Sequence, residues 1–179
     1  LPDVFLKPEQ PGREDAAMRE IPLTKGLVAL VDDEDFERVS AHTWHACDLA
    51  SGRPYAATNY RRQDGKRKTT LMHNFIAPPP EGLEVDHRNR NALDNRKENI
   101  RYGTRAQNNA NRKAWSRSGM KGVHAHGRRW HAEIYVNGRK KCLGSFGSLE
   151  EAARAYDSAA LDHYGEFALL NFPPVRAAV

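Results

Sequence analysis

The fold of residues 119–174 is constrained most strongly by a hairpin signal followed by a helix signal. Asn137-Gly138 is a preferred pair for a type I′ hairpin turn, because both residues tolerate positive φ. Ser148 and Glu151 have the spacing of a capping box, and the alanine-rich stretch after them stops at Gly165. The pattern predicts three antiparallel strands, packed on one helix. The strands are expected at 122–125, 130–136 and 140–145, and the helix at 149–164.

The preceding residues predict a separate α+β unit over 21–112. It is expected to contain a hairpin, a small β meander, and then a strand, an Asn-rich loop and a helix capped by Thr104. Residues 1–20 and 175–179 are expected to be tails, and 113–118 a linker. The acidic run 32–35 favours a helix N-terminus over a metal site. The strands are expected at 21–24, 27–31, 44–49, 55–60, 68–72 and 83–87, and the helices after 32 and over 104–114.

The basic side chains are concentrated in one part of the chain. Of the 28 Lys and Arg residues, eleven lie between 101 and 145, where Glu133 is the one acidic residue. This segment therefore has a formal charge of +10, whereas the whole 179-residue chain has +5. A compact basic stretch favours binding to a phosphate backbone, because each neutralised phosphate releases counterions.

Other features exclude several classes of protein. Two cysteines, Cys47 and Cys142, are too few for a disulfide scaffold or a zinc ribbon. The longest apolar run, Leu27 to Val31, is too short to span a membrane. The first ten residues are not a secretory signal, so a cytoplasmic protein without a membrane partner is expected.

Functional side chains crowd the segment from 85 to 109. Asp86-His87 is followed by Asn99 thirteen residues after Asp86 and by Asn108 twenty-two residues after it, with Asn95 between them. The segment resembles the HNH nucleases, most closely the phage and intron-encoded homing endonucleases. The alternative is an Asn/Asp-rich turn capped by its own side chains. The resemblance implies a ββα-metal motif.

Phosphodiester cleavage needs a hard cation and a base. Asp86 and Asn108 offer oxygen ligands, with Mg²⁺ the expected ion and Mn²⁺ an alternative. His87 is suited to be the general base, the role that the resemblance also assigns to it. Asn99 is expected to orient the His87 ring or to bridge two strands, and Asn95 to pin the loop. His73 is expected either to contact phosphate or to be structural.

Residues 119–173 resemble the APETALA-two/ethylene-response-factor (AP2/ERF) DNA-binding domain. The resemblance rests on Gly122-Val123, Trp130-His131-Ala132-Glu133-Ile134, Leu143-Gly144-Ser145-Phe146 and Leu170-Asn171-Phe172-Pro173. It implies a three-stranded sheet in the major groove of DNA, with Trp130 against the sugar–phosphate backbone. His124 and His126 lack further partners for a zinc site. The expected DNA-binding residues are Arg112, Lys113, Arg128, Arg129, Trp130, Arg139, Lys140 and Lys141.

Together these features predict a metal-dependent, site-directed endonuclease acting on double-stranded DNA, from a phage-like or bacterium-like source. A single site favours nicking unless the protein dimerises, and both monomer and homodimer remain open. No protein partner is implied. The alternatives are a catalytically inactive DNA-binding transcriptional regulator and an RNA-binding accessory protein.

Overall fold

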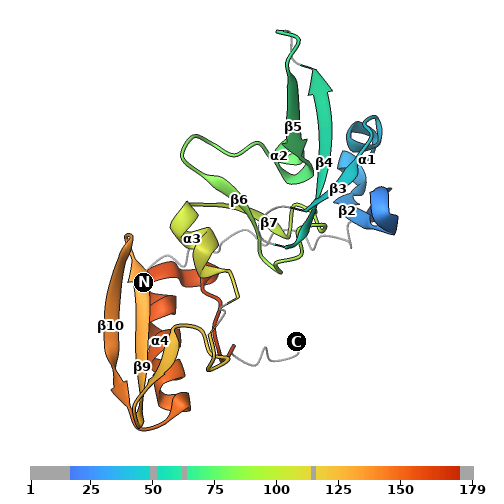
Figure 1. Cartoon of the computed structure of the whole chain (residues 1–179). Coiled ribbons are helices and arrows are strands. Elements are labelled where there is room, and N and C mark those ends of the chain that lie inside the picture. Colours follow the sequence, from blue (N-terminus) through green and yellow to red (C-terminus); the bar gives the residue numbers. More distant parts are fainter. Residues whose placement is uncertain (1–16, 49–51, 62–63, 114–115, 174–179) are drawn as a thin grey trace, which may run out of the picture.

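The computed structural model describes residues 17–48, 52–61, 64–113 and 116–173. The N-terminal unit runs from β1 to α3 and the C-terminal unit from β8 to the segment after α4; the two meet beside α3 (Figure 1). Both are built from small antiparallel sheets and short helices, so the expected mixture of α and β structure is confirmed. The predicted tail 175–179 and most of the predicted tail 1–20 lie outside the described residues.

The N-terminal unit begins with the predicted hairpin, formed by β1 (Met18–Pro22) and β2 (Val28–Asp32). A short 3-10 turn, η1 (Thr24–Gly26), joins the strands, with positive φ at Lys25 and Gly26. β1 starts within the residues expected to be a tail. Met18 to Glu20 extend the strand because β2 continues to Asp32 and offers them ladder partners.

The next elements are α1 (Asp33–Ser40) and a three-stranded meander followed by α2 (Met72–Ile76). α1 begins where the acidic run predicted it. Asp32 does not cap the helix with its side chain; it accepts from the backbone N–H of Lys97 at 2.7 Å. The meander projects beyond the rest of the unit (Figure 1) and consists of β3 (His45–Asp48), β4 (Pro54–Arg61) and β5 (Arg67–Leu71).

The last part of the unit is an antiparallel strand pair followed by a helix. The elements are β6 (Glu84–His87), β7 (Ile100–Gly103) and α3 (Arg105–Ala110). Thr104 caps α3 as expected, in a capping box with Gln107. α3 is shorter than the predicted 104–114. Asn111 ends it, and its side-chain amide bonds outside the helix, as described below.

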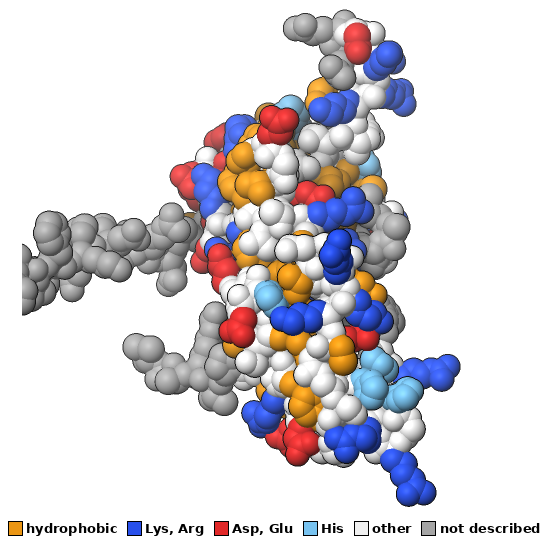
Figure 2. Space-filling view, turned by 90° about the vertical axis from the view of Figure 1, so that its left-hand side faces the viewer, with side chains coloured by type: hydrophobic (Ala, Val, Ile, Leu, Met, Phe, Trp, Pro, Cys, Tyr) orange, Lys and Arg blue, Asp and Glu red, His pale blue; other side chains and the backbone are white. Residues whose placement is uncertain are grey.

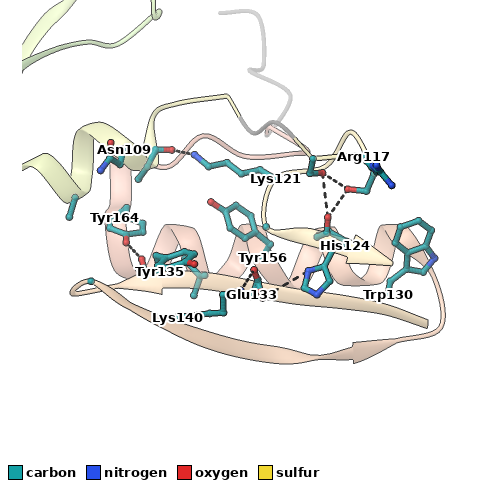
Figure 3. Close-up of a pocket in the computed structure, with 18 of the residues that line it drawn as sticks. Asn109, Arg117, Lys121, His124, Trp130, Glu133, Tyr135, Lys140, Tyr156 and Tyr164 are labelled. Carbon is teal, nitrogen blue, oxygen red and sulfur yellow. Dashed lines mark hydrogen bonds and ion pairs between the residues drawn. The ribbon is translucent and has the colours of Figure 1, made fainter. Parts of the chain in front are cut away.

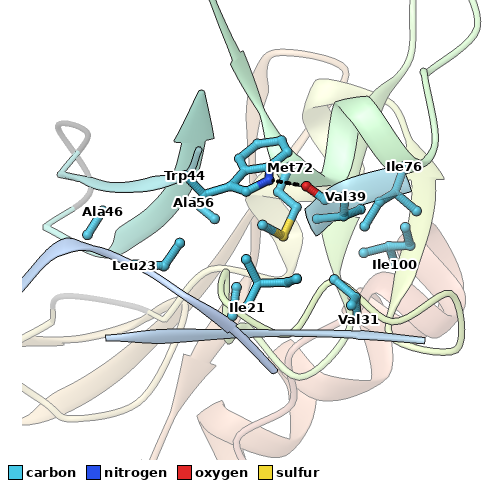
Figure 4. Packing of buried hydrophobic residues seen from close by; sticks show 11 residues of the cluster. Ile21, Leu23, Val31, Val39, Trp44, Ala46, Ala56, Met72, Ile76 and Ile100 are labelled. Carbon is cyan, nitrogen blue, oxygen red and sulfur yellow. Dashed lines mark hydrogen bonds between the residues drawn. The ribbon is translucent and has the colours of Figure 1, made fainter. Parts of the chain in front are cut away.

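One apolar cluster holds these elements together, with Met72 and Val31 fully buried within it (Figure 4). The indole N–H of Trp44 donates to the carbonyl of Val39 at 2.8 Å, so this buried polar group is satisfied. β2 also fixes the loop between β6 and β7. The N–H of Leu30 donates to the carbonyl of Leu93, and the N–H of Asn95 to the carbonyl of Leu30, both at 2.8 Å.

The C-terminal unit has the predicted architecture. Its strands are β8 (Val123–His126), β9 (Arg129–Val136) and β10 (Arg139–Phe146), with β9 central, and α4 (Leu149–Tyr164) covers one face. Asn137 and Gly138 both have positive φ, and Ser148 forms the capping box with Glu151. Ala152, Ala153 and Ala160 are buried, which allows the helix to approach the sheet closely. The 3-10 turn η2 (Gly165–Phe167) follows α4.

Within the described ranges, no helix has the length and apolar character needed to cross a bilayer.

Candidate active site and nucleic-acid interface

A hollow of about 130 Å³ lies where β6 ends beside α3. It gathers Asp86, His87 and Asn108, which the sequence had grouped. Arg112, expected to contact DNA, also reaches it. β6 supplies Asp86 and His87 as its last two residues, and α3 supplies Asn108. The other lining residues are Arg53, Tyr55, Glu84, Val85, Arg90, Ala92 and Asn111.

The Asp86 carboxylate is held by two neighbours. Arg101 lies opposite it on β7 and donates from Nε and Nη2 to Oδ2, at 3.0 and 2.9 Å. The amide nitrogen of Asn111 donates to Oδ2 at 2.9 Å, to Oδ1 at 3.1 Å and to the carbonyl of His87 at 2.8 Å. These donors fix the orientation of the carboxylate. Within the described part of the chain, Oδ1 accepts a single hydrogen bond and so retains acceptor capacity.

The His87 ring is buried, with 6% of the residue exposed. Burial lowers the pKa of His87, against smaller opposing effects of the bond to Asn95 and of the Asp86 and Asp94 charges. The imidazole is therefore neutral at pH 7. Nε2 lies 3.4 Å from Oδ1 of Asn95, whose amide nitrogen donates to the carbonyl of Leu93. Because that oxygen is an acceptor, Nε2 carries the proton and Nδ1 keeps a free lone pair.

Asn95 and Asn99 both bond within the loop between β6 and β7. Asn95, expected to pin the loop, donates from its amide nitrogen to the carbonyl of Leu93 at 3.2 Å and also contacts His87; it is 1% exposed. Asn99, expected at the His87 ring or between the strands, closes the loop. Its oxygen accepts from the N–H of Asn89 at 3.0 Å and its amide donates to the carbonyl of Asp94 at 2.7 Å. These hydrogen bonds depend on how the loop folds back on itself, and the spacing of residues in the sequence does not predict that.

His73 lies behind His87 and does not line the hollow. It is 6% exposed on α2, and its ring centroid is 5.1 Å from that of His87 and 5.8 Å from that of Tyr55. Burial, with a smaller effect of His87, lowers the pKa of His73 to about 3. A neutral, buried imidazole is a poor phosphate contact, so the structural alternative describes His73 better.

His73 makes stability depend on pH. Its pKa is about 3 when folded against 6.5 for the free side chain, so below pH 6.5 the unfolded chain binds a proton that the folded chain does not. The resulting loss of unfolding free energy is about 1.4 kcal/mol per pH unit, or about 2 kcal/mol at pH 5. We expect the unfolding free energy of His73→Phe to fall by about 2 kcal/mol less between pH 7 and pH 5 than that of the wild type. Urea denaturation at the two pH values measures both changes. Equal losses in the two proteins would contradict this.

The C-terminal sheet has one face against α4 and one facing outward. Buried Ala132 and Ile134 mark the inner face of β9, so Arg129, His131, Glu133 and Tyr135 point outward. Cross-strand partners share a face. Lys140 pairs with Tyr135 and therefore belongs to the outer face, whereas Arg139 and Lys141 pair with Val136 and Ile134 on the inner side. All three basic residues are exposed, as are Arg112, Lys113, Arg128 and Arg129.

Trp130 does not lie where the sequence predicted. It alternates with Ala132 on the inner face of β9 and packs against the apolar cluster under α4. A contact with the sugar–phosphate backbone would need the opposite face. The resemblance placed the tryptophan on DNA, but the register of β9 turns it, half-buried, towards the cluster under α4.

Charges on the outer face are partly paired. Lys140 contacts Glu133 at 2.8 Å, and Nδ1 of His124 lies 4.0 Å from the same carboxylate (Figure 3). His131 lies beside His124 and His126, at ring centroid distances of 5.7 and 4.7 Å. On the face drawn in Figure 2, Lys and Arg side chains lie over much of the molecule, with Asp and Glu side chains among them. Glu133 is the one acidic residue of the strands β8, β9 and β10.

The chain is similar to HNH endonucleases and to AP2/ERF proteins. Residues 77–110 match the HNH endonuclease family. An uncharacterized HNH endonuclease of Acanthamoeba polyphaga mimivirus is 29% identical over 154 residues, covering 82% of this chain and 76% of that protein. Residues 77–110 are called the HNH segment below, after the family whose model they match. They contain Asp86, His87, Asn99 and Asn108 of the hollow and its loop.

AP2/ERF proteins match the C-terminal region, and one of these matches extends over most of the chain. The rice (Oryza sativa subsp. japonica) dehydration-responsive element-binding protein 2E is 50% identical over 52 residues, 28% of this chain and 16% of that protein. The Arabidopsis thaliana AP2-like ethylene-responsive transcription factor ANT is 29% identical over 154 residues, 85% of this chain. This chain spans about a quarter of the latter's length, at 24%.

The side chains of the HNH segment fit a divalent cation. Asp86, Asn108 and Glu84 place oxygen donors around one hollow, which suits a hard ion such as Mg²⁺. Oδ1 of Asn108 is buried and accepts no hydrogen bond from the described residues, while its amide nitrogen donates to Glu84 at 3.3 Å. An unsatisfied buried acceptor is costly, and a bound cation would satisfy it. The acidic cluster Asp32, Glu34 and Asp35 lies elsewhere, paired with Lys97 and Arg38.

Sequence reasoning missed Arg101 and Asn111, the two donors to Asp86. Arg101 could have been found from the pairing of β6 with β7, which sets it opposite Asp86 once the strand register is known. Asn111 carried no such signal, because the helix was expected to continue past it. Its position depends on where α3 ends.

Proposed function

We propose that the chain is a metal-dependent, site-directed DNA endonuclease. Residues 21–112 act as a nuclease domain of ββα-metal type, and residues 119–174 as an AP2/ERF-like domain that docks on duplex DNA. The observation that carries the proposal is the convergence of Asp86, neutral His87 and Asn108 on one hollow within an HNH segment. We expect DNA to be the substrate and partner because the relatives are named as an HNH endonuclease and as transcription factors.

The chemistry is hydrolysis of a phosphodiester. Nδ1 of His87 takes a proton from water, the water oxygen bonds to phosphorus, the bond from phosphorus to the leaving sugar oxygen breaks, and that oxygen takes up a proton from solvent. Asp86 and Asn108 would hold the divalent ion, with Mg²⁺ expected and Mn²⁺ an alternative. When bound, the ion neutralises charge that develops on the phosphate oxygens. Asn95 keeps the His87 ring in the tautomer that leaves Nδ1 free.

Three arginines of the hollow are suited to hold the substrate. Arg53, Arg90 and Arg112 line it together with Asp86 and His87. Guanidinium groups bind phosphate oxygens with paired hydrogen bonds, so they position the strand without reading its sequence. A single hollow of this kind acts on one strand at a time, and nicking is the product expected from a monomer.

The outer face of the C-terminal sheet is the proposed docking surface. Arg129 and Lys140 project from it, and Arg128 lies in the turn before β9. Arg139 and Lys141 reach DNA from the β10 edge, and Arg112 and Lys113 from the stretch after α3. Docking raises the local concentration of the nuclease site at its target.

The second candidate function is a DNA-binding regulator without catalysis, which the plant transcription-factor relatives favour. A randomised duplex pool with Mg²⁺ separates the two, by sequencing both the bound fraction and the newly formed ends. The nuclease predicts ends at a fixed offset from an enriched motif. Enrichment of a motif with no new ends, in Mg²⁺ or Mn²⁺, would favour the regulator.

The docking surface also predicts a change in salt dependence. Lys140→Ala should reduce the slope of log affinity against log salt by about 0.9, the value for one lost phosphate contact. Arg154→Ala is the matched control, because Arg154 is also exposed and also paired with a glutamate, but lies on α4. Binding isotherms at several salt concentrations measure both slopes. Equal slopes for Lys140→Ala and wild type would show that DNA does not contact Lys140 on the proposed docking surface.

A further inference from the structure

Arg101 connects the nuclease site to the C-terminal unit. Its side chain is 7% exposed. While Nε and Nη2 bind Asp86, Nη1 donates to the carbonyl of Glu166 at 2.8 Å and lies 3.5 Å from the Glu166 carboxylate. The guanidinium also stacks on the ring of Phe167, 3.8 Å from its centroid. Every nitrogen of the guanidinium is thus in use, and one side of the group is fixed by η2.

η2 and the residues after it make further contacts with the nuclease site. Phe167 is 7% exposed and lies against β7 at Gly103, where an added Cβ would come within 2.6 Å of its ring. The same Cβ would lie 2.7 Å from Oδ1 of Asn108, so Phe167 and the proposed metal ligand share the space beside Gly103. Glu166 also pairs with Arg88, two residues after Asp86.

The chain after η2 is attached to the nuclease helix. The N–H of Leu169 donates to the carbonyl of Ala110 at 3.2 Å, near the end of α3. Lys121, which precedes β8, donates to the carbonyls of Ala110 and Arg112. In Figure 1 the segment after α4 runs beside α3. The two units are therefore joined by packed contacts at the HNH site, in addition to the covalent linker.

We propose that the segment Gly165–Leu169 of the C-terminal unit is a structural part of the nuclease site. Phe167 and the Glu166 carbonyl fix Arg101, and Arg101, together with Asn111, fixes the Asp86 carboxylate. Arg101 is a positioning residue that acts through Asp86. The inference rests on the proposed function for the metal role of Asp86. It implies that the C-terminal unit both docks on DNA and supports the geometry of the nuclease site.

The test compares Phe167→Ala with Phe172→Ala in the full chain. Phe172 is the matched control, since it is an aromatic residue of the same unit that packs in the cluster under α4. Titration with Mn²⁺ alone, followed by electron paramagnetic resonance, measures metal affinity. We expect Phe167→Ala and Arg101→Met to weaken Mn²⁺ binding by about tenfold or more, the range for residues that orient a metal ligand. Phe172→Ala should bind Mn²⁺ as the wild type does.

Hydrogen exchange of the β6 and β7 amides gives a readout that does not depend on the metal. We expect faster exchange there in Phe167→Ala and wild-type exchange in Phe172→Ala, with Phe167→Leu restoring protection. Unchanged exchange and unchanged Mn²⁺ affinity in Phe167→Ala would overturn the proposal. If the wild type binds no Mn²⁺, the metal role in the proposed function is wrong. The exchange comparison then decides the structural coupling by itself.

Discussion

Replacing His87 by alanine lowers the rate of DNA cleavage by about 10²–10⁴-fold, the usual contribution of a general base. Duplex binding stays at the wild-type level, because the proposed docking surface lies on the C-terminal sheet. Burial keeps the imidazole of His87 neutral in the hollow, and the Asn95 contact leaves its Nδ1 free to accept a proton. Single-turnover cleavage and binding measured on the same duplex test both statements.

The control for this prediction is His163→Ala. His163 is an exposed histidine on α4, and its replacement should change neither rate nor affinity. A wild-type cleavage rate in His87→Ala would remove His87 from the mechanism. A loss of rate that followed a loss of binding would make it a docking residue.

Asp86→Ala destabilises the fold as well as removing the proposed metal ligand. Asp86 and Arg101 are 12% and 7% exposed, so the change leaves a buried guanidinium without its main partner. Breaking a buried ion pair from one side costs about 3–5 kcal/mol. Glu166 still accepts from Arg101, which places the expected loss near the lower end of that range. Urea denaturation at pH 7 measures it.

The double variant Asp86→Ala/Arg101→Met separates charge from packing. Methionine fills much of the space of the arginine without its charge, so most of the lost unfolding free energy should return. Metal binding should remain absent, since the carboxylate is still missing. A single variant as stable as the wild type would show that Arg101 does not depend on Asp86.

The C-terminal unit could be predicted because its signals are local. The Asn137-Gly138 turn and the Ser148 capping box fix the strand pairing and the start of α4 from a few neighbouring residues. Trp130 was misplaced because an exposed and a buried position on β9 differ by one residue in register. The resemblance to the AP2/ERF domain did not indicate which face of β9 the Trp130 side chain occupies.

In the nuclease unit, element types were easier to predict than contacts. The Asp86-His87 strand end and the Thr104 cap follow from sequence, whereas α2 was missed between a strand and a proline run. The partners of Asp86 and His87 come from β7, from the end of α3 and from the loop pinned on β2. Such contacts depend on tertiary packing. The contact of Phe167 with Arg101 depends on how the two units pack against each other.

Conversion of supercoiled plasmid carrying a selected target is the most direct test of the nuclease assignment. Wild type with Mg²⁺, wild type with EDTA, and Asp86→Asn with Mg²⁺ are compared on one gel. The Asp86→Asn substitution keeps the shape of the side chain but removes its charge. We predict open-circle product in the first reaction and none in the other two. Product of equal amount in EDTA, or in Asp86→Asn, would contradict a metal-dependent site at Asp86.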